Sequence, residues 1–184
     1  MFFLIGGIVI LLLVFLIIFA FPQFSPIPYY PSNYQDKNRL LKSLNLNNNQ
    51  LVIDLGAGDG WVIFAAASTA YQQKLNTQFI AAEINPFLIL LLYSKRFFHP
   101  NKKNIAIKFF NILKDDYQSL AQNYPLNYTT FYLYLSPWFL STIWQRIASW
   151  PKPKTIVTYY YPINTLTPVK IIKGINNIYL YNFF

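Results

Sequence analysis

The residues best suited to chemistry form the turn DLGAGDG, from Asp54 to Gly60, which follows a short apolar run and precedes a helix-length stretch. Gly56, Gly58 and Gly60 can adopt positive φ angles and let the backbone approach a ligand closely. A dinucleotide-binding turn has the pattern GxGxxG, whose third glycine permits close packing near a pyrophosphate. Trp61 stands at that third position, and its large indole disfavours a dinucleotide.

Glycines spaced GxGxG after a strand-terminal Asp instead suit the methionine end of S-adenosyl-L-methionine. The carboxylates support this interpretation, because Asp54, Asp59 and Glu83 are half of the 6 acids in the chain. Glu83 closes the next apolar run, about 20 residues beyond the turn, where a carboxylate can accept hydrogen bonds from both ribose hydroxyls. Asn111, after the third run, is placed to bond the adenine edge. The alternatives are that the acids cap helices and that Asn111 is an ordinary turn residue.

The elements that must position these residues alternate between strand and helix signals. Apolar runs rich in β-branched and aromatic residues predict strands at 51–55, 79–83, 105–109, 131–135 and 155–161. Helix-length stretches lie between them, at 61–73, 86–98, 115–123 and 137–149. The segments 169–173 and 178–181 flank GINN and predict an antiparallel hairpin. We therefore predict an α/β, Rossmann-like fold in which a parallel sheet, covered by helices on both faces, is closed by that hairpin.

An uncharged apolar run opens the chain. Residues 2–21 have the roughly 20 residues that a transmembrane helix needs to cross a hydrocarbon core of about 30 Å. A cleaved signal peptide is the alternative, but no Lys or Arg precedes the run and bulky residues follow it. A proline-rich connector at 22–35 and a domain at 36–184 complete the predicted organisation. Because every basic residue lies after the run, we predict a single-pass membrane protein whose catalytic domain faces the cytoplasm.

Composition restricts the chemistry and the partners. The chain has no Cys and 1 His, which excludes thiolate and multi-histidine metal sites, so we expect no metal. The net charge of +9 suits either an anionic membrane surface or a nucleic acid. The basic residues are scattered singly, apart from the pairs Lys95/Arg96 and Lys102/Lys103. With no dense basic stripe in the sequence, nucleic acid is the less favoured partner.

Several motifs resemble a known family. They are DLGAGDG, EINP (Glu83–Pro86), YSKRF (Tyr93–Phe97), FFNILKDD (Phe109–Asp116) and PYYPS (Pro28–Ser32) after an apolar segment. Together they resemble the small membrane-anchored class I S-adenosylmethionine-dependent methyltransferases, which include the lysine methyltransferases of the adenine nucleotide translocase and the ATP synthase c-subunit. The resemblance covers nearly the whole chain. Two positions depart from it, because Asn111 stands where Asp is commoner and Trp61 stands where a basic residue is common.

The resemblance also implies positions for the methyl acceptor. Ser136, Pro137 and Trp138 follow the fourth predicted strand, where amino-methylating relatives of this fold place a proline-aromatic loop beside the methyl group. Tyr29, Tyr30 and Ser32 are expected to roof the pocket and bind substrate. The alternatives are that Trp138 is a core residue and that the connector residues only pack.

The function that the resemblance implies is methylation of lysine in a membrane or membrane-proximal protein, with S-adenosyl-L-methionine as cofactor. Two alternatives stay open. The acceptor could be a lipid, a small molecule or a nucleic acid, or the chain could be a non-catalytic, membrane-tethered domain that binds the cofactor.

Overall fold

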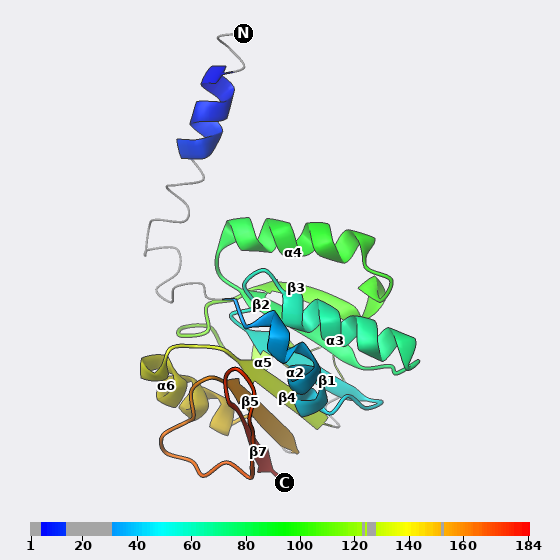
Figure 1. The fold of residues 1–184 in the computed structure, drawn as a ribbon, viewed down its shortest axis with the longest axis vertical. Helices are drawn as coiled ribbons and strands as arrows, with labels where there is room; N and C mark the ends of the chain where they lie inside the picture. The colour runs from blue at the N-terminus through cyan, green and yellow to red at the C-terminus, as the bar shows by residue number, and fades with distance from the viewer. Residues whose placement is uncertain (1–4, 14–30, 123, 125–127, 152) are drawn as a thin grey trace.

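The computed structural model describes residues 5–13, 31–122, 124, 128–151 and 153–184. Within these residues the chain forms a seven-stranded sheet in the order β3-β2-β1-β4-β5-β7-β6 (Figure 1). The strands are β1 (Gln50–Leu55), β2 (Gln78–Glu83), β3 (Ile105–Phe109), β4 (Tyr128–Leu133), β5 (Lys154–Tyr159), β6 (Lys170–Ile172) and β7 (Ile178–Phe183). β1 to β5 pair in parallel, and β7 pairs antiparallel with β5 and β6. The predicted parallel sheet closed by a hairpin is therefore confirmed.

Helices cover both faces of this sheet (Figure 1). They are α2 (Lys37–Leu44), α3 (Trp61–Gln72), α4 (Pro86–Phe98), α5 (Gln118–Ala121) and α6 (Pro137–Ala148), with the short 3-10 helices η1 (Tyr34–Asp36) and η2 (Lys102–Asn104). α2, α3 and α4 contribute to one buried apolar cluster, and α5 and α6 contribute to the other. Every side chain of β1 and β5 is buried, as expected for central strands that are covered on both faces.

Two elements differ most from their predicted bounds. β4 starts three residues before its predicted start at residue 131, because Thr129 and Thr130 join the buried strand and accept hydrogen bonds there from other side chains. The helix predicted at 115–123 is reduced to the short α5. The preceding residues form a turn instead, since the carboxylate of Asp115 accepts from the backbone N–H of Asn111 at 2.7 Å.

The N-terminal segment departs from its prediction. Residues 5–13 are helical and exposed, while the rest of the predicted span and most of the connector lie outside the described residues. In the part of the chain that the structure describes, no helix has the length and apolar character needed to cross a membrane. This finding contradicts the predicted single-pass membrane localisation with a cytoplasmic domain.

Candidate functional site

The glycine turn joins β1 to α3 at the carboxyl edge of the sheet. Gly56, Gly58 and Gly60 have φ angles of 78°, 58° and 75°, in the left-handed region that favours glycine. The backbone N–H of Gly56 donates to the carbonyl of Ala82 at 2.9 Å, which ties the turn to β2. A Cβ atom at Gly60 would lie 2.4 Å from Leu92 of α4, so this glycine also lets α4 pack closely. The turn therefore has the backbone conformation that its spacing predicted.

Trp61 and Asp59 connect the turn to neighbouring helices. Trp61 starts α3 half-buried, and its ring centroid lies 5.5 Å from that of Tyr34 in η1. Asp59 pairs through its carboxylate with the Nζ of Lys95 in α4 at 2.8 Å, and Lys95 also donates to the Asp59 carbonyl at 2.7 Å. Sequence reasoning missed Lys95 as a partner of the turn, since 36 residues separate it from Asp59 and no spacing rule links them.

Glu83 ends β2 with its carboxylate turned toward the glycine turn. One oxygen accepts from the backbone N–H of Gly58 at 2.8 Å. The other accepts from the N–H groups of Ile84 and Asn85 at 2.8 and 2.9 Å. A carboxylate has about four acceptor positions, so three of them are filled by backbone donors. One position is left for a ligand hydroxyl unless the Gly58 contact opens.

Asp54 ends β1 and is 3% exposed, opposite Tyr132 of β4 in the strand register. Among the described residues, no group donates a hydrogen bond to its carboxyl oxygens. Burial raises the pKa of Asp54 well above its usual value, and the negative charges of Glu83 and Asp59 raise it further. A cavity of about 20 Å³ lies beside it, bordered by the turn, Ser32 and Tyr132. A buried carboxyl group beside a cavity is suited to a cationic ligand group.

Ser32 covers this cavity from outside the sheet. Its hydroxyl lies 2.6 Å from that of Tyr132, and both side chains are buried. This contact places Ser32 at the predicted pocket. Tyr29 and Tyr30, the other connector residues predicted there, lie outside the described residues.

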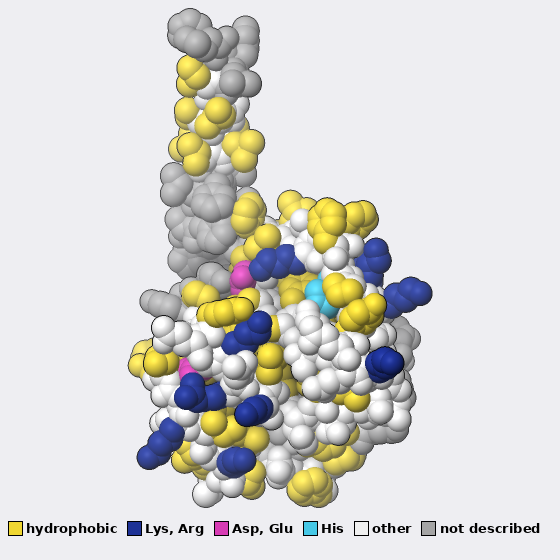
Figure 2. Space-filling view, turned by 45° about the vertical axis from the view of Figure 1, so that its right-hand side comes forward, with side chains coloured by type: hydrophobic (Ala, Val, Ile, Leu, Met, Phe, Trp, Pro, Cys, Tyr) yellow, Lys and Arg dark blue, Asp and Glu magenta, His cyan; other side chains and the backbone are white. Residues whose placement is uncertain are grey.

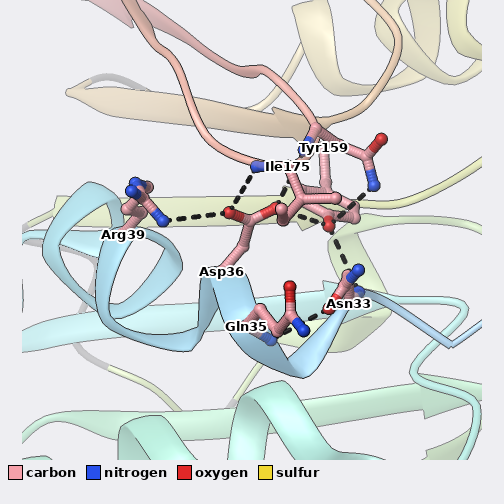
Figure 3. A network of polar contacts seen from close by, with 7 residues as sticks. Asn33, Gln35, Asp36, Arg39, Tyr159 and Ile175 are labelled. Atoms are coloured by element: carbon pink, nitrogen blue, oxygen red, sulfur yellow. Dashed lines mark hydrogen bonds and ion pairs between the residues drawn. The ribbon is translucent and has the colours of Figure 1, made fainter.

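Asp36 holds the covering segment in place (Figure 3). Its buried carboxylate accepts from the backbone N–H groups of Ile175 and Asn176 in the hairpin turn, from the hydroxyl of Tyr159 on β5, each at 2.9 Å, and from Arg39 at 3.3 Å. Burial raises the pKa of Asp36, but these donors outweigh burial, and the net pKa lies below its usual value. The carboxylate therefore links the start of α2 to β5 and to the hairpin.

Asn111 follows β3, the strand that pairs with β2 at this edge of the sheet. Its side-chain oxygen accepts from the backbone N–H of Leu113 at 2.9 Å and closes a turn after β3. Phe109, the register partner of Glu83, is 67% exposed at the same edge and was not predicted as a site residue. No sequence signal separates it from the other aromatic residues of the strands.

The proline-aromatic segment opens α6. Ser136 is the residue before the helix, Pro137 is its first residue, and both are half-buried. Trp138 is 82% exposed, so it is not a core residue. The exposed indole of Trp138 therefore follows β4, the strand that pairs with β1, and β1 leads into the glycine turn.

Comparison with known proteins identifies the fold. No protein-family model matches the sequence, and no curated protein matches it either. Among solved structures, an RNA methyltransferase from Salinibacter ruber in complex with S-adenosyl-L-homocysteine is 16% identical, with a TM-score of 0.68 over 83% of this chain and 93% of that one. The rRNA methyltransferase aviRa from Streptomyces viridochromogenes is 15% identical, with a TM-score of 0.58 over 83% and 86%.

A third similar structure is that of a precorrin methyltransferase. Precorrin-6y C5,15-methyltransferase from Geobacter metallireducens is 15% identical, with a TM-score of 0.53 over 82% of this chain and 88% of that one. At such identities the likeness shows the fold, which is that of the Rossmann-like methyltransferases. The S-adenosyl-L-homocysteine in the first structure agrees with the predicted cofactor. The narrower resemblance to the translocase and c-subunit lysine methyltransferases gains no support from these structures.

Proposed function

We propose that this protein is an S-adenosyl-L-methionine-dependent methyltransferase. The observation that carries the proposal is the left-handed glycine turn at the end of β1, bonded to the carboxylate of Glu83 at the end of β2. Open α/β sheets bind ligands at this edge, where neighbouring strands end together. Three structures of the same fold are methyltransferases, and one of them holds the product form of the cofactor.

The carboxyl groups and the glycine turn of the site fit this cofactor. We assign the ribose hydroxyls to Glu83, which keeps one free acceptor position. We assign the positively charged methionine end to Asp54, which is buried and borders the cavity. Asp59 and the three glycines, Gly56, Gly58 and Gly60, shape the turn between these two carboxyl groups, and we assign the adenine edge to the turn at Asn111.

Binding requires the cover over Asp54 to move. The cavity of about 20 Å³ has room for a water molecule but not for a methionine group. Ser32 reaches the cavity from outside the sheet, where its hydroxyl lies 2.6 Å from that of Tyr132. We propose that this contact opens when the cofactor enters and re-forms around it.

Methyl transfer is an in-line displacement, and the bound cofactor supplies an electrophilic methyl group on its sulfonium. The chain must hold the acceptor atom within about 3–3.5 Å of that methyl group. We assign this positioning to Ser136, Pro137 and Trp138. The exposed indole of Trp138 can contact an amine cation through its π-face or stack on a nucleobase. A lysine amine is the acceptor that the sequence resemblance favours, and a nucleobase amine suits the same loop.

Titration calorimetry with S-adenosyl-L-homocysteine tests the proposal. The wild-type protein should bind, and Glu83→Ala should weaken binding by roughly 2–4 kcal/mol, because a buried ribose loses a charged acceptor. Asp116→Ala is the matched control, since this acid is exposed and should leave the affinity unchanged. Absence of binding to the wild-type protein would reject the function, and equal affinities of wild type and Glu83→Ala would reject the ribose assignment.

A further inference from the structure

The surface of this protein is more basic than its net charge of +9 implies. Of its 6 acids, Asp36, Asp54 and Glu83 are buried, and Asp59 is engaged by Lys95. Among the described basic residues, by contrast, only Lys154 is buried. Figure 2 shows Lys and Arg side chains gathered over the lower part of one face. Half of the acids are therefore inside the molecule, and a fourth is ion-paired.

A basic groove lies between α2 and the β6–β7 hairpin. It has a volume of about 580 Å³. Lys42 lines it from α2 and Lys170 lines it from β6. Arg39 of α2 lines it as well, although its guanidinium also pairs with the buried Asp36 at 3.3 Å. No acid is among the described lining residues. Arg39 and Lys42 are three residues apart, so they lie on the same face of the helix. The two walls thus present cations to whatever occupies the groove.

The floor of the groove adds neutral hydrogen-bonding groups. Tyr128, at the start of β4, bonds to the hydroxyl of Thr155, which in turn donates to the side-chain oxygen of Asn182 at 2.8 Å. This bond uses the acceptor end of the Asn182 amide, so its N–H₂ end is the one available to a ligand. Cations above a floor of amide and hydroxyl groups suit phosphate oxygens.

The α2 wall leads from the groove to the proposed methyl-transfer site. Lys37, at the start of α2, donates to the hydroxyl of Tyr34 at 3.1 Å, and its Nζ lies 5.1 Å from the ring centroid. Tyr34 is 66% exposed and contacts Trp61, which borders the cavity at Asp54. An exposed aromatic ring therefore stands between the basic groove and the glycine turn.

We propose that this groove binds the sugar-phosphate backbone of a single-stranded nucleic acid and that Tyr34 stacks on a base beside the methyl-transfer site. Binding of single strands combines a groove of cations with aromatic side chains on which bases stack. Here the groove supplies the cations, and Tyr34, before the start of α2, supplies the aromatic ring. An anionic lipid surface would use the cations but not the ring. That the strand is also the methyl acceptor rests on the proposed function, whereas its binding does not.

Fluorescence anisotropy with a labelled single-stranded RNA of about 20 nucleotides tests the groove, using the full-length protein without cofactor across a salt series. The variant Lys42→Glu/Lys170→Glu should bind at least about tenfold more weakly, and its salt slope should fall by about 1.4, since each lost phosphate contact removes about 0.7. The matched control is Lys74→Glu/Lys103→Glu, two exposed lysines outside the groove, which should change the affinity less than about threefold.

A second variant tests the aromatic step. Tyr34→Ala should lower the affinity roughly five- to hundredfold with an unchanged salt slope, and Tyr34→Phe should restore most of it because the ring is kept. Equal losses in the groove and control variants would overturn the proposal. So would groove-dependent binding of phosphatidylglycerol vesicles without binding of the RNA.

The methyl acceptor is tested separately with the same RNA and labelled S-adenosyl-L-methionine. Label transferred to the RNA by wild type, and lost in the groove variant while cofactor affinity is retained, supports the strand as substrate. RNA bound by a protein that binds cofactor but transfers no label overturns that assignment and leaves the proposed function in place. RNA bound by a protein that binds no cofactor rejects the proposed function and leaves the groove in place.

Discussion

Replacing Asp54 by Asn should stabilise the free protein and weaken its binding of the cofactor. Asp54 is 3% exposed and has a raised pKa, so its folded form binds a proton more tightly than its unfolded form. Between the usual carboxyl pKa and the raised one, the folded state holds more protons than the unfolded state, and stability falls as pH rises. Asn cannot ionise, so the variant should lose this penalty.

The size of the gain follows from the burial of Asp54. A buried polar group without a hydrogen-bond partner costs about 1–3 kcal/mol, and Asn keeps only the uncharged part of that cost. We expect Asp54→Asn to be about 1–2 kcal/mol more stable at pH 8, or roughly 2–8 °C in melting temperature for a chain of this length. At pH 3, where Asp54 is protonated in both states, the two proteins should melt together.

Cofactor binding should change in the opposite direction. If Asp54 pairs with the charged methionine end, its loss should lower the affinity for S-adenosyl-L-methionine about 10- to 100-fold, on the scale of a hydrogen bond to a charged group. Binding to wild type should also release protons, because the ligand cation favours the ionised carboxyl. Calorimetry at pH 7 in two buffers of different ionisation enthalpy measures that release, and Asp54→Asn should show none.

Asp59→Asn is the control for this prediction. It removes an acid from the same turn, but this acid is ion-paired with Lys95 and partly exposed, so its loss should lower stability by at most about 1 kcal/mol. A lower melting temperature of Asp54→Asn at pH 8, or an unchanged cofactor affinity with the same proton release as wild type, would refute the reasoning.

Two further predictions concern buried charges that support the fold. Asp36→Asn should cost about 2–4 kcal/mol at neutral pH, since four donors lose a charged acceptor. Because the pKa of Asp36 is lowered in the folded state, its carboxylate stabilises the protein above the usual carboxyl pKa, and this stabilisation is lost as pH falls through the folded value. In urea unfolding between pH 2 and 7, the free energy of unfolding should therefore fall less steeply with decreasing pH in the variant than in wild type. Lys154→Met should lower the free energy of unfolding by about 2–4 kcal/mol, measured by calorimetry. The reason is that the buried Nζ donates to three carbonyl oxygens at the end of α6 at 2.7–2.9 Å. A loss below about 0.5 kcal/mol would show that water replaces the Nζ.

The helix α4, which has local end signals, was predicted to the residue. α4 runs over Pro86–Phe98 as predicted, because Asn85 caps its first turn by accepting from Phe87 and Leu88 and Pro86 occupies a first-turn position. The conformation of the glycine turn was also predictable, since glycine adopts positive φ angles without steric cost. Signals of this kind act within a few residues, so spacing in the sequence preserves them.

Contacts between distant segments had no such signal. From the sequence, Asp36 was predicted only as the first residue of the domain, yet its partners Ile175 and Asn176 lie 139 and 140 residues away. They reach it because β7 pairs with β5 and carries the hairpin turn back to α2. Gly174 shows how close the approach is, since a Cβ there would lie 2.2 Å from the carboxylate of Asp36.

The same effect changes the interpretation of the charge. The sequence shows basic residues scattered singly, and that spacing was the reason to disfavour a nucleic acid. A groove, however, is lined by residues that share a place in the fold and not in the chain. Lys42 and Lys170 are 128 positions apart and line one groove, which has no acid among its described lining residues. Singly spaced cations are therefore no argument against a polyanion in an α/β fold whose hairpin returns to its first helix.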